Sequence, residues 1–350
     1  MGADSALAHA IKELAQSKAL TQEEAAAAFG IIMRGEATPA QVAALLMALR
    51  VKQGGETPDE VAGVARALRE AMFVLPANDR ERLVDTCGTG GGSVLTFNIS
   101  TAAALLAAGA GLRVAKHGNR SFTSRSGSAD VLEALGVPLD LSVEKLAQVL
   151  EQAGIVFMFA PAMHPAMRHV GPVRRELAVP TVMNIVGPLA NPAQAGRQVV
   201  GVAEQRRLDL LANALVALGS RHALVVYGEP GLDEVSPLGE THVREVRDGK
   251  VREWTLDPTA LGIRGGKPED LAGGTPAENA VIVSDVLAGR GNPTATAAVL
   301  LNAAAALYVA ERAGTFAECV ELSRGALAAG AGTAALERLQ RASTAKTTES

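Results

Sequence analysis

The sequence predicts an α/β protein in which a small N-terminal helical domain precedes a large α/β domain with a mostly parallel central sheet flanked by helices. Two observations support this class: the first part of the chain carries helix signals only, and short apolar runs then alternate with helical segments. With 350 residues, 48% of them hydrophobic, the chain can bury one large core and a smaller one. We expect the helical domain at residues 1–76, completed by a helical segment near 164–185, and the α/β domain at residues 77–345.

Three helix starts are predicted in the N-terminal part by one local pattern. A threonine is followed three residues later by Glu or Gln in Thr21–Glu24, Thr38–Gln41 and Thr57–Glu60. In such a capping box, each side chain bonds a backbone N–H that the first helical turn leaves free. Pro39 and Pro58 follow two of these threonines, at the first helical position, where a missing N–H costs nothing. These signals predict a small domain of short helices.

The α/β part is predicted from short apolar runs that fit buried strands. They are Leu83–Thr86, Leu112–Ala115, Ile155–Phe159, Val199–Ala203 and Ala223–Tyr227. Helical segments lie between most of them, which favours a largely parallel sheet with helices on its faces. A hairpin is predicted for residues 242–247 and 251–256, which join through Asp248 and Gly249. The chain then returns to helices, with another capping box at Thr275–Glu278.

The composition argues against several classes of protein. The net charge is −4 and the pI about 5.9, whereas a nucleic-acid binder usually carries a basic excess. Cys87 and Cys319 are the only cysteines, and no disulfide framework can be built from them, which fits a reducing cytoplasm. Charged positions interrupt residues 1–20, so no signal peptide is predicted, and the alanine-rich runs are too short to span a membrane.

The first stretch that suggests chemistry is rich in glycine. Residues 85–93 read DTCGTGGGS and are followed by TFNIST at 96–101 and an alanine-rich helix. Backbone amides without side chains can approach an anion, and the N-terminus of the following helix adds its dipole. The spacing fits neither a Walker A loop nor GxGxxG. A phosphate cradle is the favoured interpretation, and a tight strand–helix turn is the alternative.

A second polar stretch, KHGNR at 116–120, directly follows a predicted strand. The carboxyl ends of strands are where open α/β sheets bind ligands. The cations of this stretch and the hydroxyls of residues 121–130 would suit a phosphate and a polar substrate. The alternative is a solvated loop in which Ser128 caps a helix at Ala129–Leu135.

Two further stretches are ambiguous when taken alone. Residues 160–168 contain His164 between small and apolar neighbours, where a histidine is more often structural than catalytic. Arg174 and Arg175 follow on a predicted helix, where such a pair usually faces solvent. NIVGPLANP at 184–192 predicts a rigid wall made by Gly-Pro and Asn-Pro turns.

An acidic pair, Asp233 and Glu234, lies in a loop after the strand predicted at Ala223–Tyr227. Mg²⁺ prefers oxygen ligands and substrate phosphates, so the pair is a candidate metal site. For an isolated Asp–Glu pair, a surface turn is the more common explanation. Each of the four stretches is therefore weak evidence for a function when taken alone, and only their combination is informative.

In combination these stretches resemble the anthranilate phosphoribosyltransferase family. The motifs are CGTGGG with TFNIST, KHGNR with SGSAD, HPAMRHVGPVR, NIVGPLANP and LDEVS, in that order, and the resemblance extends through residue 279. It implies a fold shared with pyrimidine nucleoside phosphorylases, an active site at the hinge between the two domains, and a homodimer formed through the helical domain. It also implies an enzyme of tryptophan biosynthesis, which transfers the 5-phosphoribosyl group of phosphoribosyl pyrophosphate to the amine of anthranilate and releases pyrophosphate.

The resemblance also implies roles for individual residues. Phosphoribosyl pyrophosphate would be bound by Gly88, Thr89, Gly90, Gly91, Thr96, Asn98, Ser100, Thr101, Lys116 and Ser128. Anthranilate would be bound by Gly88, His117, Asn119, His164, Arg174, Gly187 and Pro188. Mg²⁺, expected as two ions per subunit, would be held by Ser100, Asp233 and Glu234. No residue is assigned as acid or base, because the aromatic amine is already nucleophilic at neutral pH.

One residue departs from the family pattern, and two other functions are alternatives. Relatives usually carry GTGGD, and here Gly92 replaces the aspartate, which removes a carboxylate near the pyrophosphate. A pyrimidine nucleoside phosphorylase would share the fold, but KHGNR, Asn119 and Arg174 speak against it. A nucleic-acid-binding relative without transferase activity is disfavoured by the acidic pI and by the intact Asp233–Glu234 pair. Small-molecule substrates are therefore expected, with neither nucleic acid nor membrane as a partner.

Overall fold

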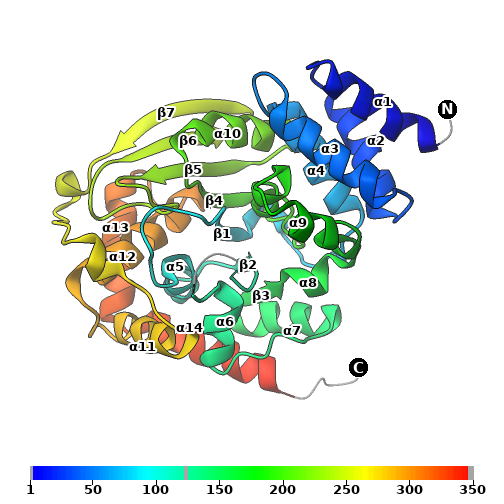
Figure 1. The fold of residues 1–350 in the computed structure, drawn as a ribbon. Coiled ribbons are helices and arrows are strands. Elements are labelled where there is room, and N and C mark those ends of the chain that lie inside the picture. Colours follow the sequence, from blue (N-terminus) through cyan, green and yellow to red (C-terminus); the bar gives the residue numbers. More distant parts are fainter. Residues whose placement is uncertain (1–2, 122–124, 346–350) are drawn as a thin grey trace.

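The computed structural model describes residues 3–121 and 125–345, and four helices begin the chain (Figure 1). They are α1 (Ala3–Ala15), α2 (Gln22–Met33), α3 (Pro39–Val51) and α4 (Pro58–Glu70). The three predicted capping boxes are confirmed: Thr21, Thr38 and Thr57 each accept a bond from the backbone three residues on, and the Glu or Gln there bonds back. Pro39 and Pro58 stand in the first turn, as predicted.

A seven-stranded sheet forms the centre of the rest of the chain, in the order β3-β2-β1-β4-β5-β6-β7. Its strands are β1 (Val84–Gly88), β2 (Val114–Gly118), β3 (Ile155–Phe159), β4 (Arg197–Gly201), β5 (His222–Gly228), β6 (Thr241–Arg247) and β7 (Lys250–Leu256). Strands β1 to β5 pair in parallel, and the predicted hairpin β6–β7 adds an antiparallel edge. The mostly parallel sheet is thus confirmed.

The apolar runs predicted the strands but not all of their ends. The prediction for β3 agrees at both ends, whereas the run Val199–Ala203 is wrong by two residues for β4. The ladder begins at Arg197, which pairs with Val84 and His222, because backbone pairing continues past the apolar side chains. Hydrophobicity alone cannot locate the start of a strand whose first residue is a buried arginine.

Helices and short 3₁₀ turns connect and cover the strands. The helices are α5 (Ile99–Gly109), α6 (Ser128–Ala134), α7 (Val143–Ala153), α8 (Ala160–Met163), α9 (Gly171–Leu177), α10 (Leu208–Ala217), α11 (Pro276–Leu287), α12 (Pro293–Val309), α13 (Phe316–Ala328) and α14 (Ala331–Thr344). The 3₁₀ turns are Arg80–Arg82, Pro165–His169, Val182–Asn184, Gly187–Leu189, Gln205–Arg207, Pro258–Leu261 and Pro268–Leu271. The capping box at Thr275 is confirmed at the start of α11. No helix in the described parts of the chain is both long and apolar enough to cross a membrane.

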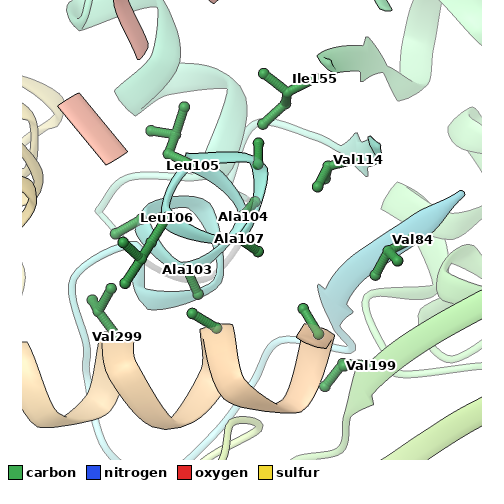
Figure 2. Packing of buried hydrophobic residues seen from close by; sticks show 14 of the residues in the cluster. Val84, Ala103, Ala104, Leu105, Leu106, Ala107, Val114, Ile155, Val199 and Val299 are labelled. Atoms are coloured by element: carbon green, nitrogen blue, oxygen red, sulfur yellow. The ribbon is translucent and has the colours of Figure 1, made fainter. Parts of the chain in front are cut away.

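One face of the sheet packs on α5, which is buried between the strands and α12 (Figure 2). Ala103, Ala104 and Ala107 are fully buried, and such small side chains let α5 approach its neighbours closely. Leu105 and Leu106 fill the space that remains. Truncating either leucine to alanine would cost about 2–5 kcal/mol of stability, because a cavity would remain. The packing therefore fixes the position of the N-terminal end of α5.

The other face of the sheet shares its core with the N-terminal helices. Leu224 and Val225, neighbours on β5, belong to opposite cores, as the alternation of a strand requires. The second core joins α1–α4 to α10 and also takes in Val170, Val173 and Val182, from the segment expected to complete the helical domain. This arrangement holds the segment around 164–190 between the first four helices and the sheet.

Candidate active site

The predicted site lies at the carboxyl edge of the parallel strands. β1 stands between β2 and β4, so the connections from β1 and β4 leave toward opposite sides of the sheet. Open α/β sheets bind ligands at such a switch point, outside the carboxyl ends of the strands. The glycine loop begins at this point, because Gly88 is the last residue of β1. Topology therefore gives the loop a position suited to a ligand.

The conformation of the glycine loop requires glycine at several positions. Gly90 and Gly91 have φ of 70° and 82°, in the left-handed region where other residues are strained. A Cβ on Gly88 would overlap Asp233 Oδ2, so the loop and the acidic pair are in close contact. By contrast, a Cβ on Gly90 or Gly91 would meet no described atom within 4 Å. The space beside these two residues is therefore open, although the Gly90 amide is bonded to Asp233.

The acidic pair bonds backbone amides of both predicted phosphate-binding segments. Gly90 N donates to Asp233 Oδ2 at 2.8 Å, and Ser100 N, in the first turn of α5, donates to Glu234 Oε1 at 3.1 Å. Burial raises the pKa of Asp233, and burial together with the charge of Asp233 raises the pKa of Glu234 to about 8. Lys116 is 3% exposed, and its Nζ donates to Ser100 Oγ at 3.3 Å. The carboxylates and Lys116 thus surround the start of α5.

These residues fit a magnesium ion by their chemistry. Both carboxyl groups and the Ser100 hydroxyl are oxygen donors, and a bound cation would favour the charged forms of the two carboxyl groups, whose pKa values burial raises. In residues 3–121 and 125–345, no cluster contains three or more His, Cys, Asp or Glu side chains placed to hold a metal. An ion here would take its remaining ligands from water and substrate phosphate, as Mg²⁺ commonly does.

The N-terminus of α5 is held from outside the helix. Asn98 is its N-cap but makes no side-chain cap bond; instead its amide donates to Ser126 O at 3.1 Å and its oxygen accepts from Asn279 Nδ2 at 2.9 Å. Thr96 is half-buried, whereas Thr101 is only 1% exposed and so lies inside the fold. The helix dipole at this end favours an anion.

Ser128 and Asn119 meet at the start of α6. Ser128 Oγ donates to Asn119 O at 3.3 Å. The alternative in which Ser128 caps the helix is wrong, because Gly127 occupies the N-cap position and Ser128 is the first helical residue. Arg120, next to Asn119, is exposed and pairs with Asp130. Residues 122–124 of the predicted hydroxyl-rich loop lie outside the described residues.

Two buried histidines come together on the opposite side of the sheet from α5. The Nε2 atoms of His117, on β2, and His164, after α8, lie 3.2 Å apart. Burial, then the charge of His164, holds the pKa of His117 well below its usual range, and burial lowers the pKa of His164 to about 4. Both rings are therefore neutral near pH 7. The pair offers a mainly apolar surface, and one hydrogen bond joins the two Nε2 atoms.

The wall predicted from NIVGPLANP forms the 3₁₀ turn Gly187–Leu189. Gln198 Nε2, on β4, donates to Pro188 O at 2.8 Å, and Arg69 Nε, on α4, donates to Leu189 O at 2.7 Å. Carbonyls of the turn are thus held both from the sheet and from the N-terminal helices. The expected turn forms at Gly187–Leu189, and its rigidity stays a prediction.

Arg174 lies on α9, half-buried, and burial lowers its pKa. No carboxylate of the described residues forms an ion pair with it, whereas Arg175 beside it is exposed. A partly desolvated guanidinium without a protein counter-ion suits an anionic ligand. Neither Arg174 nor Asn119 shares a hydrogen bond with the histidine pair within the described parts of the chain.

Sequence reasoning missed several buried polar residues that hold the site. Asp85 and Asn191 bond each other below the glycine loop, and Asn279 bonds Asn98. Asn302 bonds both the N–H and the C=O of Val235, next to Glu234. The available signal was a polar residue inside an apolar strand or helix, since such a residue is rarely buried without a partner.

Family models match both parts of the chain. The helical bundle domain of the glycosyl transferase family matches residues 8–72, and its a/b domain matches residues 80–333. The chain is also 48% identical over 330 residues to anthranilate phosphoribosyltransferase of Symbiobacterium thermophilum, covering 94% of this chain and 96% of that protein. The chain belongs to the anthranilate phosphoribosyltransferase family. The predicted resemblance to this family, the predicted fold class and the predicted assignment as a glycosyltransferase are thereby confirmed.

Other relatives agree with this assignment to the family. Anthranilate phosphoribosyltransferase of Roseiflexus castenholzii is 50% identical, covering 94% of this chain and 96% of that protein. The crystal structure of the Thermus thermophilus enzyme has a TM-score of 0.90 at 44% identity and covers 96% of this chain and 99% of that one. The Saccharomyces cerevisiae enzyme, in complex with PRPP and Mg, has a TM-score of 0.88 at 26% identity, covering 97% and 98%. These relatives favour the transferase over the nucleoside phosphorylase and nucleic-acid-binding alternatives.

Proposed function

We propose that this chain transfers the 5-phosphoribosyl group of phosphoribosyl pyrophosphate to the amine of anthranilate, giving N-(5-phosphoribosyl)anthranilate and pyrophosphate. The observation that carries the proposal is the contact of the glycine loop with a half-buried carboxylate pair at the switch point of the sheet. Amides there suit the oxygens of a pyrophosphate, and the carboxylates suit its metal ion. Relatives that are 48–50% identical along almost their full length carry the same enzyme name.

The reaction mainly requires that the protein stabilise a leaving group and orient two substrates. Pyrophosphate leaves readily only when its charge is neutralised, which Mg²⁺ would provide when bound, together with the Gly90 and Gly91 amides. The bond from C1 to the pyrophosphate oxygen breaks as the anthranilate nitrogen forms its bond to C1. The nitrogen is positively charged once this bond has formed and gives up one proton to solvent, so no protein base is required. Orientation supplies much of the rate.

The site residues divide into two groups under this proposal. The phosphoribosyl pyrophosphate group comprises Gly88, Thr89, Gly90, Gly91, Thr96, Asn98, Ser100, Thr101, Lys116 and Ser128. The anthranilate group comprises Gly88, His117, Asn119, His164, Arg174, Gly187 and Pro188. Support for the first comes from the open space beside Gly90 and Gly91 and from the buried Lys116, and support for the second from the apolar histidine pair and from Arg174, which has no ion-pair partner among the described residues. Thr101 is buried, so its part would be to support the helix start.

The remaining features follow from the same proposal. Asp233, Glu234 and Ser100 would hold two Mg²⁺ per subunit, with the substrate supplying further oxygens. We also infer a homodimer formed through the helical domain and a cytoplasmic location. Two free cysteines, one of them buried, support a reducing compartment. The domains would divide at residues 1–76 and 77–345, with the segment near 164–185 joining the helical one, as its shared core supports.

The proposal is tested by following anthranilate fluorescence. Loss of the signal should require protein, phosphoribosyl pyrophosphate and Mg²⁺ together, and Asp233→Asn with Glu234→Gln should stop it. Asp285→Asn, at an exposed surface ion pair, is the matched control and should leave the rate unchanged. No loss of anthranilate with folded protein, or turnover of thymidine with phosphate, would overturn the proposal. A salt-sensitive shift of DNA would point to the nucleic-acid alternative.

A further inference from the structure

A carboxylate without an assigned role lies beneath the site. Asp85, on β1, is 0% exposed and stands three residues before Gly88. Its Oδ1 accepts from His117 N at 3.1 Å, and its Oδ2 accepts from Asn191 Nδ2 at 2.7 Å. Burying a carboxylate is costly unless it is well compensated, and these two bonds do so together with the charge of Lys116 and a bond from the Cys87 thiol.

Asn191 is equally constrained. It is 1% exposed, its Nδ2 donates also to Ala115 O at 2.9 Å, and its Oδ1 accepts from Ala193 N at 2.8 Å. The side chain therefore has a single orientation, with the amide nitrogen toward Asp85. Asn191 closely follows the turn Gly187–Leu189, so these bonds attach the turn to β1 and β2.

The side chains of the pair lie on one side of the sheet, although the charge of Asp85 also acts on Lys116. Neighbouring side chains of a strand point to opposite faces, and Thr86, next to Asp85, donates to Ser100 O on the α5 side. Asp85 therefore faces the side of the histidine pair and the turn Gly187–Leu189. A change in Asp85 should disturb that side more than the phosphate-binding end of α5.

We propose that Asp85 and Asn191 form a positioning pair, which sets the backbone of His117 and the turn Gly187–Leu189 at the spacing that the aromatic acceptor requires. This inference rests on the proposed function and deepens it, because it assigns control of acceptor binding to residues that do not touch either substrate. One buried carboxylate joins the strand of the glycine loop to both walls of the acceptor side. Hydrogen bonds between buried groups are specific in direction, so the pair fixes orientation as well as distance.

The test exchanges the partners. Asp85→Asn places two amides face to face, and Asn191→Asp places two carboxylates face to face, so each should raise the KM for anthranilate about tenfold. The KM for phosphoribosyl pyrophosphate should stay within about twofold. The double variant restores a donor opposite an acceptor between residues 85 and 191 but leaves a carboxylate oxygen against Ala115 O, so it should recover part of the KM for anthranilate. A smaller loss in the double variant than in the single variants is the signature of the pair, since a general loss of stability would add up instead.

A contrasting variant separates the two sides of the sheet. Asn302→Asp also alters a buried amide, but one that bonds Val235 beside Glu234. It should raise the KM for phosphoribosyl pyrophosphate more than that for anthranilate. Equal effects of Asn191→Asp on both substrates, or no recovery in the double variant, would overturn the positioning role. If Asp85→Asn does not fold, Asn191→Ser removes the same hydrogen bond from the other partner. Its effects on the KM values for the two substrates are then compared in the same way.

A readout without turnover distinguishes failure of this inference from failure of the proposed function. The ring signals of His117 and His164 in NMR spectra should shift in Asn191→Asp and return in the double variant, while circular dichroism stays native. Unmoved ring signals overturn the inference even in an active enzyme. A wild-type protein that consumes no anthranilate would overturn the proposed function, whatever the histidine signals show.

Discussion

The histidine pair predicts a specific dependence of stability on pH. Burial lowers the pKa of His164 to about 4, against about 6.5 in an unfolded chain. As pH falls below about 6.5, this histidine becomes protonated in the unfolded chain. In the native state it stays unprotonated until about pH 4, so the native state loses stability between these two pH values. For His164 the linkage relation gives a loss of about 2 kcal/mol between pH 7 and pH 5.

The variant His164→Asn removes the titrating ring and should flatten this dependence. Unfolding in urea, followed by the fluorescence of Trp254, the only tryptophan, gives the free energy of unfolding at pH 7 and pH 5. The difference between the two pH values should be about 2 kcal/mol smaller in the variant than in the wild type. His9→Gln, whose ring is 52% exposed, is the control and should leave the difference unchanged. Equal pH dependence in wild type and His164→Asn would refute burial of a neutral ring.

Three further variants test the site. Arg174→Ala should raise the KM for anthranilate about 10- to 100-fold and leave that for phosphoribosyl pyrophosphate nearly unchanged, because only a carboxylate partner is lost; equal changes would argue against that partner. Asp233→Asn with Glu234→Gln should abolish turnover and the Mg²⁺ dependence of phosphoribosyl pyrophosphate binding, measured by calorimetry, while circular dichroism stays native. Gly92→Asp should weaken phosphoribosyl pyrophosphate binding at every Mg²⁺ concentration, since its Cβ would lie 2.8 Å from Gly231 O and the loop must shift; superimposable titrations would contradict this.

Local signals in the sequence predicted local structure well. A capping box needs only four consecutive residues, and those at Thr21, Thr38, Thr57 and Thr275 all form. Strand ends were harder, because the ladder at Arg197 depends on partners distant in sequence. Turn residues were informative where proline and glycine constrain the backbone, as in Gly187–Leu189.

The site was predictable as a set of segments but not as a set of contacts. Each motif carries its own chemistry, so Lys116 and the Asp233–Glu234 pair could be chosen as candidates. Their arrangement depends on bonds across 106 residues for Asp85–Asn191 and 143 residues for Gly90–Asp233. Neither periodicity nor propensity contains such pairings, since both describe neighbours along the chain. Asp85 was therefore passed over as part of a strand.

The contacts of the acidic pair also explain why a cation should accompany the anionic substrate. The Gly90 and Ser100 amides, which a phosphate would need, are already bonded by Asp233 and Glu234. A substrate oxygen and a carboxyl oxygen therefore compete for the same donors. A divalent cation held by Asp233 and Glu234 would favour their charged forms and attract the substrate oxygens as well, which would leave the two amides to the substrate. Under the proposed function, the binding of metal and substrate must then be coupled, and the coupling is reciprocal.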